Sequence, residues 1–143
     1  MAAKNFELFI GYLGNGATVC NKAVTEHGDY KTVAHISNAG NIKLYVEPDY
    51  IPAEAMQRIQ GTAAAHKKDT LEKLDQSLNI SKYSKMGPKY AKMQEQYERR
   101  RWLDELSRYL PEDGWRNFWE EYKPAATTEE KNAAIIKYIM LYF

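Results

Sequence analysis

Cysteine and histidine are scarce in this chain of 143 residues, which has one cysteine, Cys20, and three histidines, His27, His35 and His66. A single thiol excludes an internal disulfide and a zinc site with several cysteine ligands. None of the histidines has a second metal-ligating residue near it at the usual ligand spacing. We therefore expect neither a metal site nor another cofactor.

Long apolar runs are also missing. No stretch approaches the ~18 consecutive apolar residues of a membrane span. The N-terminal sequence MAAKNFELFIGYLGNG has no basic region followed by an uninterrupted apolar segment, so we expect no signal peptide and a cytoplasmic location. A hydrophobic fraction of 44% with 27% charged residues is typical of a globular chain, and the length fits a single domain over residues 1–143.

The chain has almost no net charge, since its formal value at pH 7 is +1. This excludes a strongly basic coat protein for DNA and an acidic mimic of DNA. The charge is nevertheless unevenly distributed. Residues 82–101 contain seven basic and two acidic side chains, a local net charge of +5.

The first third of the chain contains turn signals between short apolar runs. Gly14-Asn15-Gly16 is followed by ATVCNKAV, without the helix start, third glycine or Lys-Ser/Thr pair that phosphate-binding loops need. An Asn-Gly pair between apolar runs instead predicts a β-hairpin, because both residues tolerate positive φ. The stretches HGD and NAGN further along predict two more turns. We predict a four-stranded antiparallel meander within residues 1–50, with one face formed by Phe6, Leu8, Ile10 and Tyr12, and with Val33 and His35 sharing a face of the third strand.

The remainder, residues 51–143, has helical periodicity. Four helices are predicted: one from Pro52 to Leu78, one from Pro88 to Leu110, one that Pro111 opens and Pro124 ends, and a last one that begins at a capping box of Thr127 and Glu130. Residues 79–89 are polar and end in Gly-Pro, which predicts a loop or hinge. The chain is therefore predicted to be an α+β fold.

Catalytic groups are few, and we expect no enzyme. One alternative is a small enzyme in which Cys20 acts as nucleophile and His35 as base across adjacent strands. Such an enzyme needs an exposed and reactive thiol. The other interpretation is a half-buried structural thiol.

The segment of residues 82–102 interleaves cations with aromatic side chains. Tyr83, Tyr90 and Tyr97 recur every seven residues among lysines and arginines. This composition suits an acidic protein groove, and it also suits a nucleic acid with stacked bases. In a third interpretation the tyrosines and Met93 face the core, although their stripe would then continue into arginines at positions 100 and 101. The predicted partner-binding residues are Lys85, Lys89, Tyr90, Lys92, Tyr97, Arg99, Arg100, Arg101 and Trp102.

Within that set, the three arginines are expected to supply charge, and Tyr90, Tyr97 and Trp102 to supply packing. Replacing all three arginines with alanine is predicted to abolish binding and to leave the fold intact. The later aromatic run from Trp115 to Tyr122 has a helical spacing and is predicted to lie in the core.

The stretches FELFIGYLGNGATVCNKAV and GDYKTVAHISNAGNIKLYV, within residues 6–46, resemble the N-terminal module of small uncharacterised accessory proteins of bacterial conjugative elements, plasmids and prophages. The similar positions are turn and strand residues, so the resemblance carries no site with it. It implies a mobile genetic element, whose short accessory proteins often counter host defence. Anti-CRISPR and anti-restriction inhibitors that bind a nuclease effector are examples of such proteins. The first hypothesis is therefore a non-catalytic binding protein of this kind, and the second is a protein that binds RNA or DNA directly.

Overall fold

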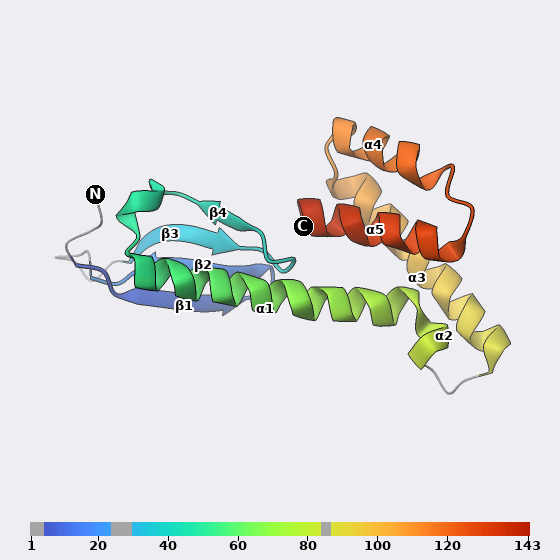
Figure 1. The fold of residues 1–143 in the computed structure, drawn as a ribbon, viewed down its shortest axis with the longest axis horizontal. Coiled ribbons are helices and arrows are strands. Elements are labelled where there is room, and N and C mark those ends of the chain that lie inside the picture. The colour runs from blue at the N-terminus through green and yellow to red at the C-terminus, as the bar shows by residue number, and fades with distance from the viewer. Residues whose placement is uncertain (1–4, 24–29, 84–86) are drawn as a thin grey trace. The chain divides into compact units, whose positions relative to one another are not determined.

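The computed structural model describes residues 5–23, 30–83 and 87–143, and it confirms an α+β fold in which four strands precede the helices (Figure 1). The elements are β1 (Leu8–Leu13), β2 (Gly16–Asn21), β3 (Lys31–Ile36), β4 (Ile42–Leu44), the 3₁₀ helix η1 (Pro48–Tyr50), α1 (Ala53–Leu78), α2 (Ile80–Tyr83), α3 (Pro88–Tyr109), α4 (Glu112–Tyr122) and α5 (Thr128–Tyr142).

The chain divides into two compact units, which we call the sheet unit (residues 1–68) and the helical unit (residues 69–142). The division falls inside α1, so this one helix contributes its first part to the sheet unit and its last part to the helical unit. The predicted hinge at residues 79–89 contains the short helix α2, and residues 84–86 lie outside the described part.

The four strands form one antiparallel sheet in the order β1-β2-β3-β4, as a meander requires. Leu13 pairs with Gly16, so the predicted first hairpin is confirmed, with Gly14-Asn15 as its two-residue loop. The positive φ falls on Gly16, at +124°, and not on Asn15. A side chain at Gly16 would also overlap the carbonyl oxygen of Ile36, so the glycine is needed both for its backbone angle and for space.

One detail of the predicted alternation is wrong. Val33 was expected to share a face with His35, but Val33 is fully buried together with Ala34 and Ile36, whereas His35 is half-buried. The register between β2 and β3 shifts between Val19 and Cys20, which is a β-bulge. The extra residue of a bulge breaks the simple inside-outside alternation, and that accounts for the burial of two consecutive residues.

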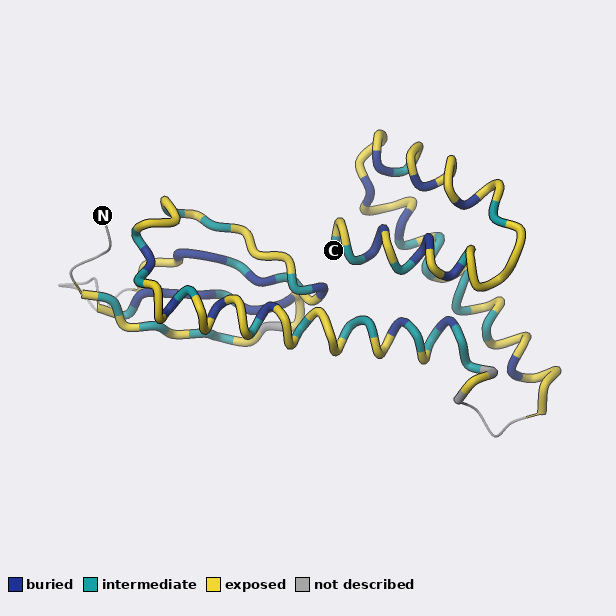
Figure 2. Tube along the Cα trace, in the orientation of Figure 1, coloured by how far each residue is buried: buried dark blue, intermediate teal, exposed yellow. Residues whose placement is uncertain are grey.

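The core of the sheet unit lies between one face of the sheet and the first part of α1. Its sheet side consists of Ala17, Val19, Val33, Ala34 and Ile36, and its α1 side of Ala55, Ile59 and Ala63, with Ile51 ahead of the helix. Phe6, Leu8 and Ile10 pack against this cluster, as their predicted face requires. Figure 2 shows the buried stretches of β2 and β3 facing a buried stripe along this part of α1.

Asn21 is a buried polar residue that ties the start of β1 to this core. Its Oδ1 accepts hydrogen bonds from the backbone N–H groups of Glu7 (2.9 Å) and Ala23 (3.0 Å). Its Nδ2 donates to the carbonyl oxygen of Asn5 and to the hydroxyl of Tyr50, both at 3.1 Å. Both polar atoms of this buried amide therefore have hydrogen-bond partners, as buried polar groups require.

The helical unit packs the aromatic face of α4 against α5. Phe118 is fully buried, and its ring contacts those of Tyr122 and Tyr138 at 5.2 and 5.4 Å between centroids. The predicted capping box is present at the start of α5, because Thr127 Oγ1 accepts from the N–H of Glu130 at 3.1 Å. The Glu130 carboxylate accepts from the N–H of Ala126, one residue earlier than the usual partner.

Candidate functional site

An uncovered row of large side chains runs along α3. Tyr90, Met93 and Tyr97 are 66%, 62% and 63% exposed, and Arg100 follows them on the same side of the helix. We call these four residues the α3 stripe. The opposite side of α3 contains the buried residues Ala91 and Leu106, so it is this side that faces the helical unit (Figure 2). The interpretation in which the tyrosines and Met93 face the core is therefore wrong for Tyr90, Met93 and Tyr97, while the side chain of Tyr83 lies outside the described part.

The C-terminal half of the α3 stripe forms a shallow hollow of about 250 Å³, lined by Met93, Gln96, Tyr97 and Arg100. Lys89 and Lys92 are exposed in the preceding turns. A helical spacing places Lys89 one turn from Met93, next to the stripe. The hollow therefore combines the apolar Met93 and Tyr97 with the polar Gln96 and Arg100, and Lys89 adds a second cation nearby.

Arg99 does not belong to this exposed surface, although its two neighbours in sequence are exposed. It is half-buried, and its Nε donates to Oδ1 of the buried Asn132 at 3.1 Å. Asn132 Nδ2 in turn donates to the carbonyl oxygen of Leu78 at 3.2 Å and to Oδ1 of Asn79 at 3.1 Å. Arg99 thus helps to hold α3, α5 and the end of α1 together.

Arg101 and Trp102 also make contacts within the helical unit. The Arg101 guanidinium forms an ion pair with Glu98 at 2.6 Å and lies over the Trp102 ring, 5.0 Å from its centroid. Trp102 Nε1 donates to Ser77 Oγ at 3.2 Å, and Ser77 donates to Glu98 at 2.7 Å. These bonds fasten α3 to the last turns of α1 and leave Trp102 half-buried.

The predicted partner-binding residues therefore separate into three groups. Lys89, Tyr90, Lys92, Tyr97 and Arg100 are exposed on α3, whereas Arg99 and Trp102 turn inward and Arg101 is exposed but paired. Lys85 lies outside the described residues. Met93 and Gln96 were missing from the predicted set, although Met93 lies three positions after Tyr90 and four before Tyr97, and Gln96 lies four positions before Arg100, spacings that could have identified both.

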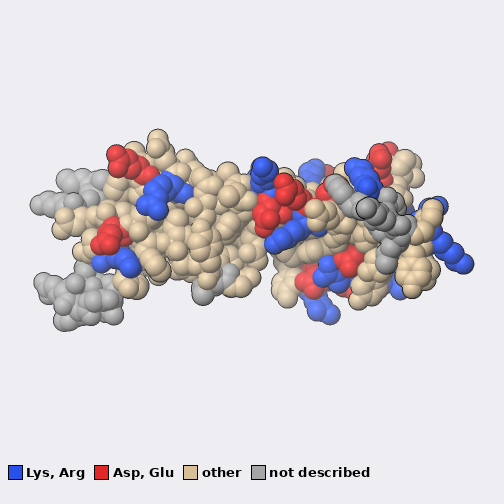
Figure 3. Space-filling model, turned by 90° about the horizontal axis from the view of Figure 1, so that it is seen from below, with Lys and Arg blue, Asp and Glu red and all other residues tan. Residues whose placement is uncertain are grey.

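Charge on this molecule is mixed rather than segregated on the face that Figure 3 shows. Lys and Arg side chains lie beside Asp and Glu side chains there, and neither sign forms a broad continuous area. Phosphate backbones favour extended positive surfaces. The mixed pattern on this face favours short, local charge contacts.

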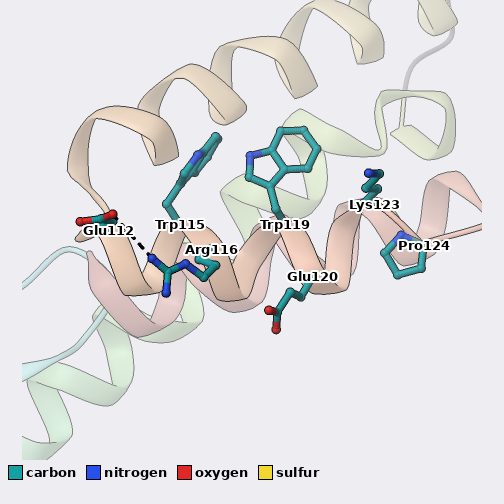
Figure 4. A pocket seen from close by; sticks show the side chains of 7 residues that line it. All are labelled: Glu112, Trp115, Arg116, Trp119, Glu120, Lys123 and Pro124. Carbon is teal, nitrogen blue, oxygen red and sulfur yellow. Dashed lines mark ion pairs between the residues drawn. The ribbon is translucent and has the colours of Figure 1, made fainter.

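An aromatic pair of the half-buried Trp115 and the exposed Trp119 lies on α4 (Figure 4). Trp115 and Trp119 project from the same side of the helix, with ring centroids 5.5 Å apart and their planes nearly perpendicular. Together with Glu112, Arg116, Glu120, Lys123 and Pro124 they line a hollow of about 500 Å³. The predicted core position of the aromatic run is confirmed for Phe118 and Tyr122, whereas Trp115 is half-buried and Trp119 is 39% exposed.

No family model, curated protein or solved structure matches this chain. The resemblance of residues 6–46 to accessory proteins of mobile elements thus stays a prediction. In the described part of the chain, none of the helices combines the length and apolar character that crossing a bilayer requires.

The geometry around Cys20 and His35 bears on the enzyme alternative. Cys20 pairs with Thr32 across the sheet and His35 pairs with Thr18, so the two candidate groups are not direct cross-strand neighbours. Cys20 is only 6% exposed, and its Sγ lies 3.9 Å from Thr32 Oγ1. Among the described residues no hydrogen bond joins Cys20 to His35, and nowhere do three His, Cys, Asp or Glu side chains gather to hold a metal ion.

Proposed function

We propose that this chain is a non-catalytic binding protein whose α3 stripe docks into an acidic groove of a protein partner. The observation that carries the proposal is the exposure of Tyr90, Met93 and Tyr97, each above 60%, on a helix whose opposite side is fixed to the helical unit. Aromatic residues, methionine and arginine are enriched where protein interfaces concentrate their binding energy. Covering one such side chain fully contributes roughly 1.5–3 kcal/mol of transfer free energy.

The rigidity of the stripe supports the same proposal. The bonds from Arg99 to Asn132 and from Trp102 to Ser77 attach α3 to the rest of the helical unit, so the helix does not need to form on binding. A preformed surface loses less conformational entropy when a partner docks. Arg100 within the stripe and Lys89 beside it favour a partner with carboxylates at the margin of its groove.

The resemblance of residues 6–46 suggests which partner to look for first. In accessory proteins of mobile elements, a binding protein without catalytic groups can act by occupying a host nuclease effector. We therefore propose a CRISPR or restriction nuclease, alone or with its bound nucleic acid, as the first partner to test.

Direct binding of RNA or DNA by the same segment is the second candidate function. Exposed tyrosines next to lysines are the groups on which single-stranded bases stack, and this favours it. One feature counts against it: Arg99 and Arg101 already have partners within the chain.

The deciding experiment is a pull-down with the tagged full chain from a lysate of its host, with and without nuclease treatment, followed by mass spectrometry. Tyr97→Ala and Arg100→Ala are compared with Tyr45→Ala, which removes a tyrosine that is 53% exposed in the sheet unit. We expect a stoichiometric protein partner that survives nuclease, is lost with the two α3 variants and is retained with Tyr45→Ala. Loss of all bound material on nuclease treatment, with steep salt dependence for any polyanion, would replace this proposal with nucleic-acid binding.

A further inference from the structure

Strand β1 is an edge strand whose own sequence lacks the residues that usually protect an edge. It occupies one end of the sheet order, and its sequence LFIGYL contains neither a charged residue nor a proline (Figure 1). Its pairing with β2 runs without a register shift from Leu8 to Leu13. Natural sheets usually block such an edge with lysine, proline, a bulge or a covering element, because its free backbone groups recruit other strands.

The unused backbone groups of β1 can be assigned from one hydrogen bond. The N–H of Lys22 donates to the carbonyl oxygen of Glu7 at 2.9 Å. In an antiparallel ladder the hydrogen-bonded pairs alternate, so the odd-numbered residues of β1 bond to β2. Leu8, Ile10 and Tyr12 therefore direct their N–H and C=O groups to the open edge, where no strand of the described residues pairs with them.

The side chains along this edge are apolar on both faces. Leu8 and Ile10 are half-buried on the α1 side, and Tyr12 on the same side is 68% exposed. Phe9, on the other face, is 39% exposed, and its ring lies against the position that a Cβ of Gly11 would occupy. A hollow of about 320 Å³ lies beside the start of the strand, and it is lined by the apolar Phe6, Leu8, Pro52 and Ala55 together with the charged Glu7, Glu54 and Arg58.

We propose that β1 pairs antiparallel with β1 of a second copy of this chain, which joins two four-stranded sheets into one. A two-fold axis at Ile10 places Ile10 opposite Ile10, Leu8 opposite Tyr12 and Phe9 opposite Gly11. In each pair the two side chains point to the same face of the joined sheet, because both residue numbers are even or both are odd. The α1 side of one sheet therefore continues into the α1 side of the other. The three residues with free backbone groups become the hydrogen-bonded pairs of the new ladder.

The self-complementarity of this register favours a second copy over a foreign strand. Each apolar side chain meets another apolar side chain or a glycine. The strand contains no charged residue that pairing would bury without a partner. The two Phe9 rings become diagonal neighbours across the junction, at a separation of roughly 7–8 Å that aromatic side chains can span. The strand also carries no charged group that would select a different partner.

Sedimentation equilibrium of the full chain, over a wide concentration range, tests the proposal. We expect the apparent mass to rise from 16.6 kDa toward twice that value. Tyr12→Pro removes an N–H that faces the edge, without removing a bond to β2, and should give a monomer. The matched control Tyr12→Val keeps this N–H and removes only the ring, and it should remain a dimer.

Cysteine cross-linking tests the register and does not depend on the proline variant being folded. In a Cys20→Ser background, Ile10→Cys should form a disulfide-linked dimer under mild oxidation, because directly opposite residues lie within disulfide reach. Thr32→Cys, exposed on β3 and away from the edge, should not.

Three results would overturn the self-pairing. A wild-type chain that stays monomeric throughout would do so, as would a folded Tyr12→Pro variant that remains a dimer. If the chain is a monomer and a protein partner found in the pull-down is lost with Tyr12→Pro, the edge pairs with a strand of that partner instead. Because this edge belongs to the sheet unit and the α3 stripe to the helical unit, failure here is distinguishable from failure of the proposed binding function.

Discussion

Arg99 Nε donates to Oδ1 of Asn132 at 3.1 Å, and this single bond separates Arg99 from the two arginines that follow it in sequence. Asn132 is 2% exposed, so its amide has no water to replace a lost donor. A triple-alanine variant of Arg99, Arg100 and Arg101 would therefore disturb the helical unit as well as its surface. The expectation that such a variant keeps its fold intact is not supported, and binding tests should use Arg100 by itself.

Replacing Arg99 with alanine should lower the free energy of unfolding by about 1–3 kcal/mol, because a buried acceptor loses its partner. Arg100→Ala on the exposed stripe should change it by less than about 0.5 kcal/mol. Urea denaturation followed by tryptophan fluorescence measures both, since Trp102, Trp115 and Trp119 all lie in the helical unit. Equal stability of the two variants would contradict the structural role of Arg99.

Two glycines should respond to alanine with opposite signs. Gly40 has a φ of +85°, and a Cβ there would overlap the carbonyl oxygen of Ala63, so Gly40→Ala should destabilise the sheet unit. Gly61 lies inside α1 with no atom within 4 Å of an added Cβ, and Gly61→Ala should stabilise the helix by about 1 kcal/mol. Thermal unfolding followed by circular dichroism checks the pair, and a stabilising Gly40→Ala would contradict the turn geometry.

Thr127 should contribute a measurable cap to α5. Its Oγ1 accepts a hydrogen bond from the N–H of Glu130, and replacing it with alanine leaves that group without its side-chain partner. We expect Thr127→Ala to lose about 1 kcal/mol of stability and Thr127→Ser to lose much less. Denaturant midpoints of both variants measure this, and equal losses would mean that the hydroxyl is not the cause.

The helical unit should lose stability in alkaline solution. Burial raises the pKa of the Tyr122 phenol, and the positive charge of nearby Arg99 opposes this shift only in part. The pKa of Tyr122 in the folded chain lies above the unfolded value of about 10. The contribution of its neutral phenol to folding stability is therefore fully present below pH ~10, and it is lost as the pH rises through the folded pKa. Tyr122→Phe should flatten the stability profile above pH ~10, and an unchanged slope would show that other groups cause the loss.

Local signals in the sequence were sufficient for most of the fold. The Asn15-Gly16 pair predicts the first hairpin and the capping box of Thr127 and Glu130 the start of α5, and the residues of β1 alternate as expected, because each of these features is encoded within a few neighbouring positions. The bulge near Val33 was not predictable, since a register shift depends on how β2 and β3 pair rather than on either strand alone.

For the candidate site, composition identified the segment of residues 82–102, but it did not identify which of its side chains are exposed. The sequence by itself determined an α+β chain with a cation-rich, tyrosine-rich helix and one uncharged apolar strand at its start, because composition, period and turn residues act locally. Only the tertiary structure decided that Tyr90, Met93 and Tyr97 face outward and that Arg99 is bound to Asn132. Those outcomes depend on which distant residues compete to cover each side chain, and Asn132 lies 33 positions from the arginine that it holds.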